Sequence, residues 1–205
     1  MASPLAALKR GVLRPQDASE IYAQPHAEFL RWAREGVLLK VAHGYYAHIP
    51  EPSRGTHWRP EIEALALGIG QADYGKNEVA LMHISAARFH GSISRALAVA
   101  VLAVPKQRPN LETTCGRIVF VRRDIDSLKK IRVETELAMG WCTSVEQTVL
   151  DLARRPDLVR GLSEVSMEAA RTLFRRVNEK KLRVVLDEQR MGSALNRLNS
   201  WTKNA

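Results

Sequence analysis

The alternation of apolar and polar positions is clearest near the amino terminus, in residues 36–50 (GVLLKVAHGYYAHIP). Leu39 and Val41 stand at alternating positions, His43 and Gly44 interrupt the run, and a second strand-like run follows. Two such runs around a two-residue turn that contains glycine predict a β-hairpin. An isolated hairpin is marginally stable in water, so we expect it to pack against neighbouring structure.

Two helical patterns precede the hairpin. Residues 14–23 (RPQDASEIYA) begin with a proline at a position typical of the first helical turn, and residues 24–36 (QPHAEFLRWAREG) repeat this arrangement and end in Gly36. The inward face of the second helix is expected to consist of Leu30, Ala33 and Val37, with Trp32 and Tyr46 in the core. Helix, short turn, helix and hairpin is the order of a winged helix-turn-helix.

In such a module the second helix enters the major groove of DNA, and the side chains at its amino end reach the base edges. The candidates for base contact are Gln24, His26 and Arg31. The candidates for phosphate contact are Arg10, Arg14, Arg34, Lys40, His43 and, through its hydroxyl, Tyr45. Two alternatives stay open: His26 caps the helix, or the module binds a protein, because Glu28 and Glu35 oppose phosphate binding.

Residues 49–60 are rich in proline, glycine and serine and lack apolar periodicity, which predicts a linker with few contacts to either side. Beyond it, helical patterns cover residues 61–72, 83–90 and 145–155 and the tail from residue 161. Strand-like runs cover residues 96–105 and 116–125, with one or two more in 131–142. Thr143 and Glu146 have the spacing of a capping box. We therefore expect an α+β protein, with a winged helix-turn-helix in residues 1–57 and a mixed α/β domain with a helical tail in residues 58–205.

Charge adds a second indication of an anionic partner. The chain has 31 Lys and Arg residues against 22 Asp and Glu residues, a net charge of +9. One dense cluster of basic residues lies in the tail and consists of Arg171, Arg175, Arg176, Lys180 and Lys181. This cluster is either a solvated helical face or a docking surface for an anionic partner.

The residues that carry chemistry do not form a recognised catalytic or metal-binding motif. Cys115 and Cys142 are far apart, which favours neither a zinc site nor a disulfide framework, and we expect a reduced, cytoplasmic chain without cofactor or metal. No apolar run approaches the roughly 20 residues that cross a bilayer. His83, Ser85, His90 and Asp151 could be read as a nucleophile with its base, but no G-x-S-x-G elbow surrounds Ser85. Ser85 fits better as a helix N-cap and His83 as a residue that fastens a neighbouring loop, so we expect no catalytic residues.

Three stretches together resemble one family. They are LRWAREGVLLKVAHGYYAHIP (30–50), ALMHISAARFHG (80–91) and GWCTSVEQTVLDLA (140–153). Their order and spacing resemble the AbiEi family, the antitoxins of type IV toxin–antitoxin systems. His43 stands where family members typically carry Arg before the glycine of the wing, which lowers the positive charge of the wing at neutral pH.

The resemblance implies a DNA-binding winged helix joined to an antitoxin domain. Such a protein represses its own operon by binding operator DNA, and it counters a partner toxin of the nucleotidyltransferase type. The basic residues of the tail would then face the toxin. Two other functions stay open: an ordinary winged-helix transcriptional regulator with a C-terminal domain that senses a small molecule, and an enzyme that modifies the toxin.

Overall fold

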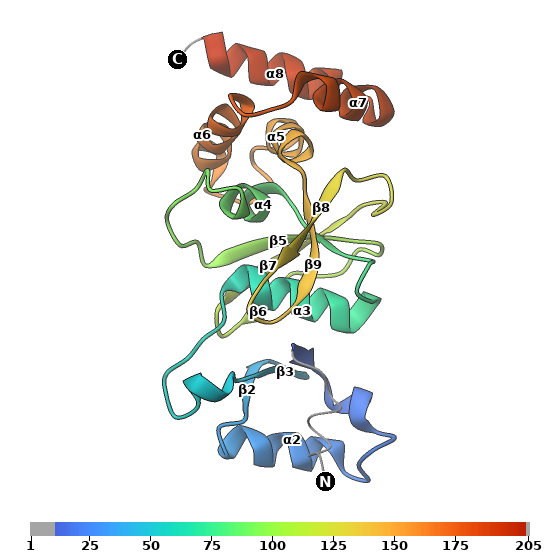
Figure 1. Cartoon of the computed structure of the whole chain (residues 1–205), viewed down its shortest axis with the longest axis vertical. Helices are drawn as coiled ribbons and strands as arrows, with labels where there is room; N and C mark the ends of the chain where they lie inside the picture. The colour runs from blue at the N-terminus through green and yellow to red at the C-terminus, as the bar shows by residue number, and fades with distance from the viewer. Residues whose placement is uncertain (1–10, 204–205) are drawn as a thin grey trace.

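The computed structural model describes residues 11–203, which form an elongated stack of helices and two β-sheets (Figure 1). The predicted α+β class is confirmed. Arg10, a predicted phosphate contact, lies outside the described residues.

The small sheet contains β1 (Val12–Leu13), β2 (Leu38–Ala42) and β3 (Tyr45–His48) in the order β1-β3-β2. The predicted hairpin is confirmed: β2 and β3 are antiparallel around His43 and Gly44, and Gly44 has a positive φ of 79°. A register shift between Lys40 and Ala42 bends β2 close to this turn.

Helix α2 (Pro25–Arg34) covers one face of the small sheet. Its C-cap is Glu35, one residue before the predicted Gly36. Gly36 follows with a positive φ of 70°, and the N–H of Val37 donates to the carbonyl oxygen of Trp32 (2.9 Å). The predicted inward face is confirmed for Ala33 and Val37, and Trp32 and Tyr46 are buried as expected. It is wrong for Leu30, which is 43% exposed, while Phe29 is buried instead. The aromatic side chains fill the space above Leu38 and Tyr46, and this rotates Leu30 outward.

The helix predicted in residues 14–23 is much shorter in the structure. Only a 3₁₀ turn, η1 (Pro15–Ala18), forms there. After Ala18 the chain leaves the helical path, and Tyr22 packs edge-on against Trp32 with ring centroids 5.3 Å apart.

The large sheet contains six strands in the order β6-β7-β5-β4-β9-β8. The pairs β5–β7 and β4–β9 are parallel, and the other neighbours are antiparallel. The strands are β4 (Ala80–Leu81), β5 (Val99–Val104), β6 (Leu111–Thr113), β7 (Gly116–Arg122), β8 (Lys130–Glu134) and β9 (Met139–Thr143). The continuous apolar run of β5 reflects burial on both faces of the sheet.

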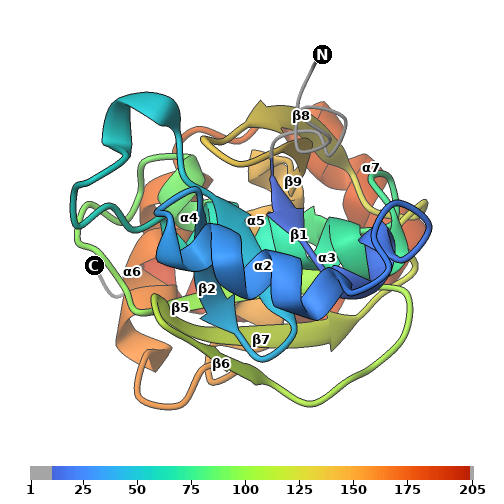
Figure 2. The same cartoon turned by 90° about the horizontal axis from the view of Figure 1, so that it is seen from below.

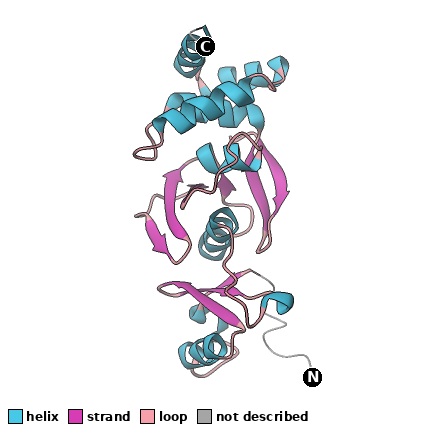
Figure 3. Cartoon of the chain, turned by 90° about the vertical axis from the view of Figure 1, so that its left-hand side faces the viewer, coloured by secondary structure: helices cyan, strands magenta, loops and turns pink. Residues whose placement is uncertain are grey.

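Helix α3 (Ile62–Tyr74) covers one face of the large sheet, and α4 (His83–Phe89) and α5 (Val145–Arg154) lie on the other (Figure 1). Three tail helices form a further layer over α4 and α5 (Figure 3). They are α6 (Ser163–Phe174), α7 (Glu179–Gln189) and α8 (Gly192–Lys203). In the described part of the chain, no helix has the length and apolar character needed to cross a membrane.

Helix α3 lies between the two sheets, so its first nine residues are all buried. The hairpin contributes Val41 and Ala47 to the same apolar cluster as α3 and the large sheet. A side chain at Gly68 would come within 2.6 Å of Val12, and one at Gly70 would overlap Leu102. The two glycines therefore let the helix approach a sheet on each side, which explains the Gly-Ile-Gly sequence.

The predicted linker makes few contacts over residues 51–57, which are mostly exposed, but the expectation is wrong at its end, where Trp58 packs against the apolar cluster of α3 and the large sheet. After a short 3₁₀ turn, η2 (Glu51–Ser53), the indole N–H of Trp58 and the backbone N–H of Glu61 donate to the carboxylate of Glu136. The division of function at residues 57 and 58 stays a prediction.

The carboxylate of Asp73, at the end of α3, holds the two parts of the molecule together. It accepts hydrogen bonds from Arg14 (2.8 Å) and from the hydroxyl of Tyr45 (2.8 Å), and it forms an ion pair with Arg108. Arg14 and Tyr45 belong to the amino-terminal part, and Arg108 to the loop between β5 and β6.

We predict that Asp73→Ala lowers the free energy of unfolding by about 1–3 kcal/mol, because it leaves two guanidinium groups and a hydroxyl without their shared acceptor. Urea unfolding followed by tryptophan fluorescence measures this loss. Glu112→Ala is the control, since Glu112 and Arg117 form an exposed pair whose loss should cost less than about 0.5 kcal/mol. Equal losses in the two variants would contradict the role assigned to Asp73.

Candidate functional site

Helix α2, at one end of the molecule (Figure 2), carries or is capped by four of the nine predicted DNA contacts. Gln24 is the N-cap residue, and His26, Arg31 and Arg34 are exposed along the helix. No side-chain hydrogen bond caps the amino end of α2, so the alternative that His26 caps the helix does not hold. Lys40 on β2 and His43 in the turn are also exposed.

Arg14 and Tyr45 do not fit this surface. Both bind Asp73 on the side of the hairpin that faces α3. Tyr45 and Tyr46 are adjacent in one strand, so their side chains point to opposite faces, and it is Tyr46 that lies against α2. The prediction that Arg14 and Tyr45 contact phosphates is therefore not supported by their geometry.

The positive charge of Arg31 is offset by the carboxylates of Glu28, on the same helix, and of Glu35, its C-cap residue. Its guanidinium lies 2.6 Å from Glu28 and 3.0 Å from Glu35. The hydrogen bond to Glu28 raises the pKa of Arg31, with a further contribution from Glu35. Because exposed pairs of this kind are weak, Arg31 can exchange them for another acceptor.

The basic residues of the tail divide into two groups. Arg176 donates to the carbonyl oxygen of His90 (2.7 Å), and Arg171 is partly buried, so both have a place in the packing. Arg175, Lys180 and Lys181 are exposed and form no side-chain hydrogen bond or ion pair within residues 11–203. These three residues, which we call the tail cations, belong to the end of α6 and to α7, and these two helices lie at the end of the molecule opposite α2 (Figure 1).

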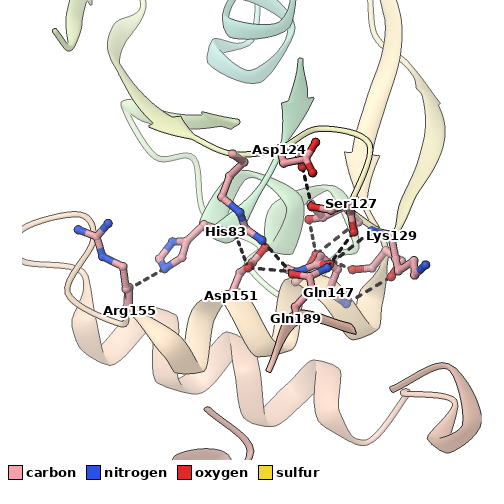
Figure 4. A network of polar contacts seen from close by, with 12 residues as sticks. His83, Asp124, Ser127, Lys129, Gln147, Asp151, Arg155 and Gln189 are labelled. Atoms are coloured by element: carbon pink, nitrogen blue, oxygen red, sulfur yellow. Dashed lines mark hydrogen bonds and ion pairs between the residues drawn. The ribbon is translucent and has the colours of Figure 1, made fainter. Parts of the chain in front are cut away.

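A buried polar network connects α5 to the end of β7 and to α7 (Figure 4). Asp151 on α5 is 3% exposed, and its Oδ1 accepts hydrogen bonds from Arg123 (2.8 Å) and Gln147 (3.2 Å). Arg123 and Gln147 also donate to Gln189 of α7 (both 3.0 Å). The network thereby attaches the tail to the sheet.

His83, Ser85, His90 and Asp151, which the sequence suggested as a possible catalytic group, each form hydrogen bonds with other residues and not with one another. His83 Nε2 donates to the carbonyl oxygen of Arg155 (2.9 Å), and His90 Nε2 to that of Thr143 (2.8 Å). Ser85 Oγ accepts the backbone N–H of Val101 (2.8 Å). His83 fastens a distant loop as predicted, whereas Ser85 lies inside α4 and is not its N-cap. Among the described residues, no three His, Cys, Asp or Glu side chains converge to hold a metal ion.

A family model for the AbiEi antitoxin C-terminal domain matches residues 78–201. The chain belongs to the AbiEi antitoxin family. The match begins just before β4 and ends within α8, so it spans the large sheet and all three tail helices. Comparison with curated proteins gives no match.

The AbiEi motif around residues 143–152 has a structural explanation that differs from the predicted capping box. The N-cap of α5 is Ser144, which accepts the N–H of Gln147 (3.3 Å), while Thr143 bonds to Thr148 (2.8 Å). Glu146 accepts the N–H of Asn178 (3.1 Å) and so reaches the start of α7. The cap moves by one residue because the strand β9 extends through Thr143.

Sequence reasoning missed Arg123 and Gln189, which complete the network around Asp151. A pair of arginines directly after a buried apolar strand was the available signal for Arg123. Gln189 carried no such signal, because it is one of many polar residues in a helical tail.

We predict that Ser85→Ala lowers the free energy of unfolding by about 1–3 kcal/mol, because the N–H of Val101 is left buried without an acceptor. Chemical denaturation measures the loss, and the exposed Ser94→Ala variant serves as the control. A folded Ser85→Ala protein should keep its antitoxin activity. Loss of that activity at unchanged stability would instead indicate a chemical role for the hydroxyl.

Proposed function

We propose that this AbiEi protein has two functions carried by its two ends. The α2 end binds operator DNA and represses the operon of the protein itself. The antitoxin domain neutralises a toxin of the nucleotidyltransferase type that is encoded nearby.

The order of elements in the amino-terminal part supports DNA binding. A short strand, β1, precedes the turn η1 and helix α2, and it then joins the hairpin as a third strand in the order β1-β3-β2. A hairpin wing joined by an earlier strand is typical of winged-helix proteins, although the first helix of the pair is reduced here to a 3₁₀ turn. This arrangement places α2 as the outermost layer of the molecule, where it can enter a groove (Figure 2).

The charge of α2 sets the expected mode of binding. Arg31 and Arg34 are offset by Glu28 and Glu35, so the helix has little net charge with which to attract phosphates. Specific contacts from Gln24, His26 and Arg31 are then more important than general attraction. The exposed Leu30 favours a second candidate, a protein-binding role for the same face.

The positive charge of the tail cations supports their assignment as the surface on which the toxin docks. Nucleotide-handling enzymes commonly carry exposed carboxylates that hold metal ions, and Arg175, Lys180 and Lys181 would complement such a surface. Helices α6 and α7 lie at the opposite end of the molecule from α2 (Figure 1), so one chain would be able to bind DNA and toxin together.

We predict that Arg31→Ala weakens binding to the operator by about 10-fold or more and relaxes the preference at one base pair. Lys40→Ala should weaken binding to all duplexes alike and reduce the salt dependence. Fluorescence anisotropy with operator and random duplexes at several salt concentrations measures both effects. Equal losses for Arg31→Ala on the two duplexes would exclude base contact, and no binding to any duplex would favour the protein-binding role.

We predict that Arg175→Glu combined with Lys180→Glu abolishes protection against the toxin, because it replaces attraction with repulsion at the docking surface. Operator binding should stay unchanged. Growth assays with the product of the adjacent gene, together with co-purification, test this, and Arg160→Glu is the control on another exposed loop position. Weakened operator binding with intact protection would assign the tail cations to DNA.

A further inference from the structure

Strand β8 is an open edge of the large sheet. Among the described strands it pairs only with β9, and it lies at the margin of the molecule in the view of Figure 2. The opposite edge strand, β6, has three residues, and the N–H of Thr114 just after it donates to the carbonyl oxygen of Val41 in the hairpin (2.9 Å). By contrast, β8 has five residues, keeps a regular register with β9 and contains no proline. Folded proteins usually shorten, bend or cover such an edge, so its exposure suggests a partner.

The backbone of β8 presents a set of free hydrogen-bonding groups along this edge. The N–H of Thr135 donates to the carbonyl oxygen of Ala138 (2.9 Å) in the continuation of the β8–β9 pair. In a regular antiparallel pair every second residue bonds to the neighbouring strand, so the odd-numbered residues of β8 bond to β9. The N–H and C=O groups of Lys130, Arg132 and Glu134 therefore point outward. In the described part of the chain these groups have no hydrogen-bond partner.

The approach to this edge is open. A groove of about 710 Å³ is lined on one side by Arg132, Glu134 and Met139 of the β8–β9 hairpin and on the other by residues of α3 and β1. Ile131, in the middle of the edge, is 41% exposed. A further strand beside β8 would lie at the rim of this groove and cover Ile131.

Two side chains of β8 give the edge opposite charges that have no ion-pair partner. Arg132 and Glu134 are both exposed, and they lie on the same face of the strand because they are two residues apart. The guanidinium of Arg132 stacks over the ring of Trp141 (4.4 Å). Neither Arg132 nor Glu134 forms an ion pair within residues 11–203. Lys130 differs from them, because its Nζ donates to the carbonyl oxygen of Ile125 (2.6 Å).

These charges select one register for the pairing of two β8 strands. The outward-pointing groups must face each other, so a two-fold axis passes through one of the three inner residues. An axis at Ile131 sets Arg132 opposite Lys130, and an axis at Arg132 sets two arginines opposite each other, so both place like charges together. An axis at Val133 sets Arg132 of each copy opposite Glu134 of the other copy. Opposite charges that face each other across a strand pair stabilise it.

We propose that β8 pairs with β8 of a second copy of this chain, antiparallel about a two-fold axis at Val133, and so joins the two large sheets into one. A second copy fits because the edge complements itself both in charge and in backbone hydrogen bonds. None of the residues assigned above to DNA or to the toxin takes part, except that Lys40 and the hairpin share the same molecule, so the proposal does not depend on either function. A strand pair of this length forms a small interface, and we expect a reversible dimer with a dissociation constant in the micromolar range.

Sedimentation velocity of the full-length protein at concentrations from about 1 to about 200 μM measures this association. We expect a monomer–dimer equilibrium that reaches twice the mass of one chain at the upper end. A protein that stays monomeric over the whole range, or that forms larger open-ended assemblies, overturns the proposal.

A proline at position 132 tests the backbone pairing. Arg132→Pro removes an N–H that points away from β9, so it leaves the β8–β9 hydrogen bonds in place and blocks only the outer edge. Arg132→Ala is the matched control, since it removes the same side chain and keeps the N–H. We expect Arg132→Pro to abolish the dimer and Arg132→Ala to weaken association by about 2- to 30-fold. Equal effects of the two substitutions overturn the pairing through the backbone.

A charge exchange tests the register and does not require that the proline variant folds. Arg132→Glu and Glu134→Arg should each prevent dimerisation, because each sets like charges opposite each other. The double variant restores opposite charges across the axis at Val133 and should dimerise again. Arg160→Glu, on an exposed loop, should dimerise like the unsubstituted protein. A double variant that stays monomeric overturns this register, and dimers that persist in both single variants overturn the site.

Discussion

The burial of α3 between two sheets is the constraint on which the rest of the structure depends. A helix with sheets on both sides needs small residues where each sheet approaches, and Gly68 and Gly70 meet this need against Val12 and Leu102. The hairpin is therefore covered on both faces, by α2 on one and by α3 on the other. This explains how a hairpin that would be marginal alone becomes a stable joint between the amino-terminal part and the antitoxin domain.

The same arrangement places the polar residues in and near the hairpin in two different environments. Tyr45 and Arg14 face α3 and bind Asp73, whereas Lys40 and His43 are exposed near the turn. Since Asp73 also pairs with Arg108 of the antitoxin domain, one carboxylate links Tyr45 of the hairpin and Arg14 before η1 to the loop after β5.

The antitoxin domain uses its polar motif residues mainly to join segments that are distant in the sequence. Glu146 reaches α7, His83 reaches the loop after α5, and Asp151 connects β7 to α5. Each of these buried groups has at least one hydrogen-bond partner, as buried polar groups in folded proteins usually do. His83 Nδ1 and Asp151 Oδ2 have no hydrogen-bond partner among the described residues.

The sequence alone determined the elements whose pattern is local. The hairpin, helix α2 with its end just before Gly36, the apolar strands β5 and β7 and the helical tail follow from periodicity, proline, glycine and β-branched residues, and the three motifs placed the chain in the AbiEi family. Tertiary structure decided which face of each element is buried. Leu30 is exposed because Phe29 and Trp32 fill the core, and the cap of α5 is Ser144 because β9 continues to Thr143. The partners of Asp73 and Asp151 come from segments tens of residues away, so local periodicity carries no information about them; they are set by how the two sheets and their helices pack.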